Sequence, residues 1–180
     1  LMNMNTEFID NYRTSSKYFQ EAMQEAICLI NIDSELFKVD FNIMRLAQTE
    51  ITVPESNFNR FLYSQKTEIM HRRANSVNKL NSLLVYSLNE LFLLLKRVIE
   101  IHSSADEVAL CQKLLNSIIA FINKPYVIND IDISAIERSS LLLILKYDEK
   151  KEDYPQFDQI LNNLIKLHNI AYRPIADRKA

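Results

Sequence analysis

Arg97 and His102 are the residues of this 180-residue chain whose types and spacing best suit catalysis. A histidine ring can serve as general acid or base on a ribose 2′-hydroxyl or on a leaving oxygen. An arginine nearby can hold the scissile phosphate through paired hydrogen bonds and stabilise the charge that develops on it. The pair therefore forms a candidate catalytic site.

An arginine followed by four residues and then a histidine, here Arg-Val-Ile-Glu-Ile-His over 97–102, resembles the signature of the HEPN-domain ribonucleases, which are small α-helical bundles. The resemblance implies metal-independent cleavage of RNA by Arg97 and His102, at a site that forms across a homodimer. The chain departs from the family pattern at Val98, where a polar residue is common, and in placing the motif at the end of a helix.

His71, Arg72 and Arg73 form the densest basic cluster of the chain. They could bind a phosphate or an acidic partner. The alternative is that they form a solvent-exposed helix face that binds no ligand. Glu68 and His71 have the three-residue spacing of ligands in di-iron bundles, but no second Glu-x-x-His follows and the neighbouring arginines would repel a cation. We therefore predict no metal site, and we predict no cofactor.

Two isolated cysteines, Cys28 and Cys111, lie outside any Cys-x-x-Cys pair, which favours the cytoplasm or another reducing compartment. Cys111 lies on an apolar helical stripe and is expected to be a buried, inert thiol. The longest apolar runs are too short to cross a membrane. The net charge of −2 gives no general attraction to nucleic acid, which leaves only the local basic cluster for such binding.

The chain has no glycine, although about a dozen are expected at average usage. Glycine supplies the positive φ angles that hairpin turns, bulges and phosphate-binding loops require. Its absence favours an all-α fold and excludes Walker A loops, dinucleotide fingerprints and glycine-flanked nucleophile elbows.

The apolar spacing predicts a single-domain antiparallel bundle of five or six helices around a long central helix, with a short basic tail at 173–180. A first helix is expected over about 6–31, with a break at Asp33 and Ser34 and a further helix before Pro54. The stretch 57–102 forms one long helix or two joined near 71–75. Later helices are expected after Ser104, after Ser134 and around Pro155.

The long stretch carries two lines of residues at seven-residue intervals, as in a coiled coil. One line contains Met70, Val77, Leu84, Leu91 and Val98, and the other contains Ala74, Asn81, Leu88, Leu95 and His102. Both lines are predicted to face the core, with Asn81 as a buried polar residue that sets the register.

These features favour a non-catalytic helical module for protein interaction or regulation, with a protein partner or a second copy of the chain as its target. The first alternative is the ribonuclease that uses Arg97 and His102. The second is a helical bundle that holds an apolar ligand in its core or acts as a sensor.

Overall fold

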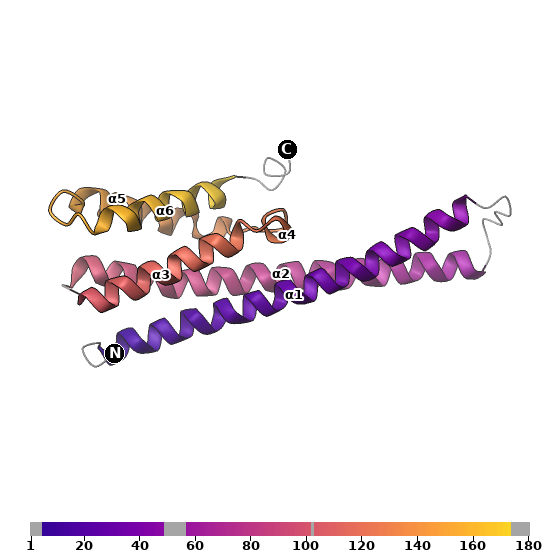
Figure 1. Ribbon diagram of the computed structural model, residues 1–180, viewed down its shortest axis with the longest axis horizontal. Helices are drawn as coiled ribbons and strands as arrows, with labels where there is room; N and C mark the ends of the chain where they lie inside the picture. Colours follow the sequence, from indigo (N-terminus) through magenta and orange to yellow (C-terminus); the bar gives the residue numbers. More distant parts are fainter. Residues whose placement is uncertain (1–4, 49–56, 102, 174–180) are drawn as a thin grey trace.

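The computed structural model describes residues 5–48, 57–101 and 103–173, and this part of the chain is entirely helical apart from its turns. The predicted all-α bundle is confirmed (Figure 1). The elements are α1 Thr6–Ala47, α2 Asn57–Glu100, α3 Ala105–Ile122, α4 Pro125–Ile128, a 3₁₀ turn Ser134–Ile136, α5 Glu137–Lys150 and α6 Phe157–Tyr172.

The two longest helices, α1 and α2, form an antiparallel hairpin. At 1.5 Å per residue their 42 and 44 residues extend roughly 63 and 66 Å. Neither helix contains a proline or glycine, so nothing in the backbone interrupts them. Their register is fixed by cross-helix hydrogen bonds, including Ser15 Oγ to the Ser87 carbonyl at 2.8 Å and Ser76 Oγ to the Glu25 carboxylate at 2.7 Å.

The predicted break at Asp33 and Ser34 is wrong, because α1 continues through both residues to Ala47. The Asp33 side chain does not cap a new helix. It instead accepts a hydrogen bond from Arg73 Nε at 2.6 Å across the hairpin. Asp33, although aspartate is common at the first position of helices, therefore lies inside α1, where its ion pair with Arg73 holds it. Of the two alternatives for the stretch 57–102, the structure shows one continuous helix, Asn57–Glu100, and not two helices joined near 71–75.

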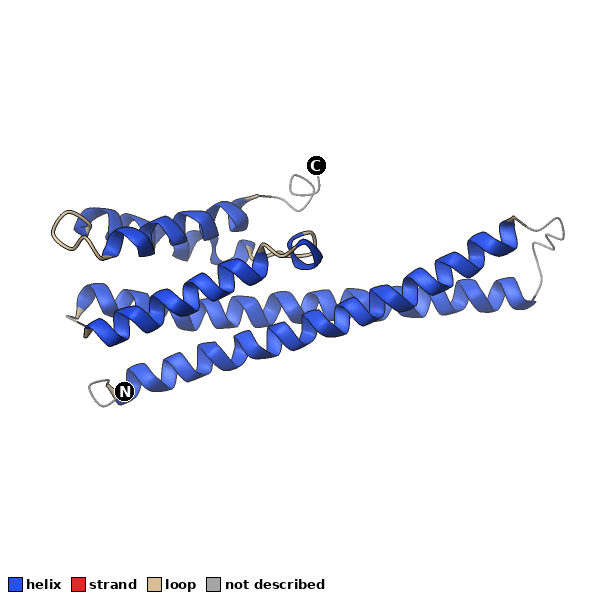
Figure 2. Ribbon diagram, in the orientation of Figure 1, coloured by secondary structure: helices blue, strands red, loops and turns tan. Residues whose placement is uncertain are grey.

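A second layer, made of α3 to α6, covers only one half of the hairpin (Figures 1 and 2). Ser104 caps α3 by accepting a hydrogen bond from the Glu107 backbone N–H, as the sequence predicted. Pro125 begins the short α4, and Pro155 lies two residues before α6. The layer and the covered half of the hairpin, here called the body, share one continuous apolar core.

Several polar and aromatic contacts attach the second layer to the hairpin. The Tyr147 hydroxyl of α5 donates to the Leu95 carbonyl at 2.7 Å, and the Phe121 ring of α3 packs edge-on against Phe19 of α1. Asn81 donates to the Asp130 carbonyl at 2.9 Å through its side-chain amide. It also accepts a hydrogen bond from the backbone N–H of Asp132. The polar residue predicted to set the register therefore fastens the loop after α4 to α2.

The other half of the hairpin, residues 30–47 and 57–77, projects beyond the second layer and is here called the arm (Figure 1). The two predicted core lines of α2 are buried in the body at Leu84, Leu88 and Leu91. On the arm the prediction is wrong, because Met70 is 52% exposed and Ala74 is also exposed. The same lines emerge into solvent where the second layer ends.

Candidate functional site

The structure places Arg97 near the end of α2, beside the N-terminal turn of α1. Its Nη1 lies 3.7 Å from the Glu7 carboxylate, and its buried Nε–H has no acceptor within the described part of the chain. His102 lies outside the described residues. The two predicted catalytic residues are therefore not brought together here, and the ribonuclease hypothesis stays a prediction.

The predicted basic cluster is paired with acids at two of its three positions. Arg72 forms ion pairs with Glu35 of α1 and, at 3.9 Å, with Glu68 of α2. The hydrogen bond between Arg72 and Glu35 lowers the pKa of that carboxyl and raises the pKa of the guanidinium. His71 is exposed. Phosphate binding at this cluster stays a prediction, and a phosphate would have to compete with these carboxylates.

Arg73 binds two acids from distant parts of the chain. Its Nε lies 2.6 Å from Asp33 of α1, and its Nη2 lies 3.0 Å from Asp130 of the loop after α4. The hydrogen bonds that Arg73 donates to Asp33 and, secondly, to Asp130 raise the pKa of the guanidinium above its ordinary value. Arg73 therefore joins both helices of the hairpin to the second layer at the boundary between body and arm.

Neither a metal centre nor a membrane-spanning helix is found among the described residues. No group of three histidine, cysteine, aspartate or glutamate side chains is close enough there to hold a metal ion. No helix in the described ranges has the length and apolar character that crossing a membrane requires.

The Cys111 thiol is fully buried in the core, as predicted. Burial, and secondly the nearby Glu107 carboxylate, raise its pKa to about 12. A thiol held in its neutral form is a poor nucleophile, so Cys111 serves the packing of α3.

Raising the pH above about 8.5 should therefore destabilise the protein through Cys111. An unfolded thiol loses its proton near pH 8.5, while the folded thiol keeps it to about 12. The native state then binds more protons than the unfolded state, so the free energy of unfolding falls by about 1.4 kcal/mol per pH unit.

Urea unfolding at pH 7.5 and pH 10, compared between the protein and its Cys111→Ala variant, measures this contribution. Both proteins carry Cys28→Ser, which removes the exposed thiol and its intermolecular disulfides. Between these pH values the cysteine-containing protein should lose about 2 kcal/mol more stability than the variant. An identical loss in both would mean that the Cys111 thiol titrates normally in the folded state.

The arm carries an exposed apolar face that is built from both helices. Leu62, Ile69 and Ser76 of α2 are buried at seven-residue intervals against α1. On α1 the side chains that face α2 include the buried Leu29 and Val39 and the half-buried Leu36, Asp40 and Ile43. Six large apolar residues that directly follow Leu29, Leu36, Asp40, Ile43, Leu62 and Ile69 are exposed, namely Ile30, Phe37, Phe41 and Met44 on α1 and Tyr63 and Met70 on α2.

Helical geometry puts these six side chains on the same side of the hairpin. Successive residues of an α-helix are rotated by about 100° around its axis. Because the two helices are antiparallel, a residue that directly follows a position between the helices projects to the same side of the hairpin from either helix. In the body this side carries Leu84 and Leu88, which the second layer covers. We call the six side chains the arm face. Phe37 is the most open of them, at 71% exposed.

The charged residues beside the arm face are basic. The four acids of the arm, Asp33, Glu35, Asp40 and Glu68, all pair with bases of the arm. Lys38 and Arg45 directly follow Phe37 and Met44 on the outer edge of α1, and Arg60 precedes Tyr63 by three residues on α2. An apolar strip with basic edges is the result.

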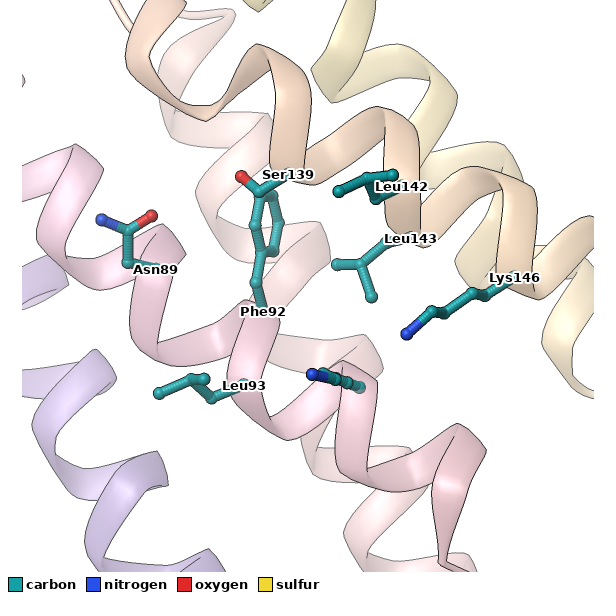
Figure 3. Close-up of a pocket in the computed structure, with 8 residues that line it drawn as sticks. Asn89, Phe92, Leu93, Ser139, Leu142, Leu143 and Lys146 are labelled. Atoms are coloured by element: carbon teal, nitrogen blue, oxygen red, sulfur yellow. The ribbon is translucent and has the colours of Figure 1, made fainter.

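A groove of about 370 Å³ lies between α2 and α5 (Figure 3). Each helix contributes four residues with the same spacing and order: a small polar residue, two apolar residues and a lysine. The residues are Asn89, Phe92, Leu93 and Lys96 from α2 and Ser139, Leu142, Leu143 and Lys146 from α5.

The two helices run in the same direction along the groove, so both lysines lie at one end and both small polar residues at the other. Figure 3 shows Phe92 and Leu143 between the helices, with the Lys146 side chain directed back toward α2. The Lys96 and Lys146 ammonium groups lie 4.0 and 3.6 Å from the same oxygen of Glu100. That end of the groove therefore holds one more positive than negative charge.

Neither the arm face nor the groove was predicted from the sequence. The groove has a visible signal, because 89–96 and 139–146 share the pattern polar-x-x-apolar-Leu-x-x-Lys. The arm face also has one, since no later helix exceeds 18 residues, and helices of that length packed side by side leave part of a 44-residue helix uncovered. Comparison with known proteins finds no match to this chain among protein-family models, curated sequences or solved structures.

Proposed function

We propose that this protein is a non-catalytic interaction module and that the arm face is its contact surface. The observation that supports the proposal is a change from burial to exposure along one heptad line of α2. Leu84 and Leu91 are fully buried beneath the second layer, whereas Met70, on the same line, is exposed beyond it. The second layer covers this side of the hairpin in the body, and no described element covers the same side on the arm.

The shape of the arm face suits a helical partner. Phe37 and Met44 are seven residues apart on α1, and Tyr63 and Met70 are seven apart on α2. Side chains at this spacing along two antiparallel helices form the groove into which a third helix packs. A partner helix with a matching apolar stripe would bury the arm face, as α3 to α6 bury the apolar residues on the same side of the hairpin in the body.

The charge of the edges defines the partner further. Lys38, Arg45 and Arg60 flank the arm face, and the one acid between Lys38 and Arg45, Asp40, is paired with Lys66. Opposite charge across an interface selects the partner and speeds association, while like charge opposes binding. We therefore expect an amphipathic helix whose apolar stripe is flanked by glutamate or aspartate.

Two synthetic helical peptides of about four heptads test this proposal directly. Both carry leucine at the core positions, and they differ only in having glutamate or lysine at the flanking positions. By fluorescence anisotropy the acidic peptide should bind at least tenfold more tightly than the basic one. The preference should shrink as salt is added, because exposed charges are screened.

The variant Phe37→Asp/Phe41→Asp should lose binding of the acidic peptide. Phe61→Asp is the matched control, because Phe61 is exposed on the same arm but precedes the buried Leu62, so it leaves α2 on the opposite side. Equal binding by both variants would contradict the proposal. Sedimentation showing a dimer of the protein that Phe37→Asp/Phe41→Asp dissolves would also contradict it, by making a second copy the occupant.

We also infer a reducing compartment for this function. Cys28 is exposed and Cys111 is buried, and the two thiols are unpaired. An exposed free thiol persists where glutathione and thioredoxin keep cysteines reduced.

A further inference from the structure

We propose that the groove between α2 and α5 binds a single-chain anionic amphiphile of the fatty-acid class. The carboxylate would lie at the lysine end and the acyl chain along the apolar floor. The site lies in the body, apart from the arm face, and does not depend on the function proposed above.

The lysine end of the groove is suited to a carboxylate. Lys96 and Lys146 come from different helices, and both ammonium groups already approach one carboxylate oxygen, that of Glu100. A second carboxylate there would balance the charge that Glu100 leaves unpaired. Charge-assisted hydrogen bonds from ammonium to carboxylate are stronger than neutral ones, so the head group contributes selectivity for anions.

The remaining length of the groove is suited to a hydrocarbon chain. Its volume of about 370 Å³ lies within the usual range of small-molecule sites, roughly 300 to 1,000 Å³. Phe92, Leu93 and Leu142 line it, and Leu142 is 53% exposed. The seven-residue span from Asn89 to Lys96 rises about 10 Å, a distance that a chain of roughly eight carbons covers.

The small polar residues at the far end limit the ligand. Asn89 and Ser139 close the apolar floor one helical turn beyond Phe92 and Leu142. A chain that reaches them gains nothing from further methylenes, because those carbons would meet an amide and a hydroxyl. The affinity is therefore expected to rise with chain length only up to the length of the groove.

Calorimetric titration of the full chain with hexanoate, octanoate, decanoate and octanol tests the site. Each buried methylene should tighten binding about fourfold, and the increase should stop between octanoate and decanoate. Octanoate should bind more tightly than octanol by about tenfold. Octanol binding as tightly as octanoate would overturn the assignment of the lysine end as a carboxylate site.

Three variants locate the binding. Lys96→Gln/Lys146→Gln should weaken octanoate binding about tenfold and leave octanol binding unchanged. Leu142→Asn should weaken both ligands. Leu145→Asn is its matched control, because Leu145 is on the same helix and 54% exposed but does not line the groove.

Two further outcomes would overturn the proposal. One is equal weakening by Leu142→Asn and Leu145→Asn, which would mean that octanoate adsorbs to the leucine surface of α5 and not to the groove. The other is an absence of octanoate binding at millimolar concentration. Binding of an acidic amphipathic peptide that Leu142→Asn abolishes would then assign the groove to a protein helix.

Discussion

Replacing Leu84 by asparagine should unfold the protein at room temperature or bring it close to unfolding. Leu84 is fully buried between the hairpin and the second layer. Removing a buried leucine costs about 2–5 kcal/mol, and burying an unpaired amide adds about 1–3 kcal/mol. Together these approach the whole stability of a typical domain, about 5–15 kcal/mol. Circular dichroism during urea or thermal unfolding measures the loss.

Met70→Asn is the matched control for this prediction. Met70 lies two heptads before Leu84 on the same line of α2 but is exposed on the arm. Exposed substitutions away from special features usually change stability by no more than about 0.5 kcal/mol. A large destabilisation by Met70→Asn would show that the arm face is covered in the protein as it folds, and the separation into body and arm would be wrong.

Tyr147→Ala should cost about 3–5 kcal/mol, as expected for a large buried ring. Tyr147 is fully buried on α5, and its hydroxyl donates to Leu95 of α2. Its ring also packs edge-on against Phe157 of α6, with centroids 5.2 Å apart. The residue therefore joins three helices, and its loss leaves a cavity where they meet. The same burial raises the pKa of the phenol.

Tyr147→Phe separates the ring from the hydroxyl. It keeps the ring and removes only the hydrogen bond to Leu95, so it should cost about 1 kcal/mol. Urea midpoints of the two variants give the comparison. Similar losses for Tyr147→Ala and Tyr147→Phe would mean that the hydroxyl, and not the packing of the ring, attaches α5 and α6 to α2.

The helical class and much of the core could be predicted from local chemistry. The absence of glycine indicated helices, and Ser104 followed by acids indicated the start of α3. The apolar line of α6, which runs from Phe157 through Leu164 to Ala171, is buried, and its seven-residue spacing is visible in the sequence. In each case the deciding interactions lie within one helix or along one of its faces.

The boundary between body and arm could not be predicted in the same way. Met70 and Leu84 occupy equivalent positions in one heptad line, so the pattern assigns both to the core. Whether either is buried depends on how far the second layer extends along the hairpin, which is a tertiary property. The hairpin itself uses another line, through Leu62 and Ile69, which lies next to the predicted one.

The candidate sites show the same division between local and tertiary information. The basic residue types at 72 and 73 were evident in the sequence, but their acidic partners were not. Asp33 and Asp130 are distant in the chain and meet Arg73 only after folding. Spacing arguments detect ligands on one helix, and these sites combine side chains from several.

Site-specific photo-cross-linking tests the central claim, that the arm face is the contact surface, most directly. A photoreactive phenylalanine analogue is placed at position 37 or, as the control, at position 61 in the full chain within cells, and each cross-linked peptide is sequenced. We predict a discrete product from position 37, joined to an amphipathic helical segment with acidic flanks, and none from position 61. No discrete product from position 37, or the same products from both positions, would contradict the account.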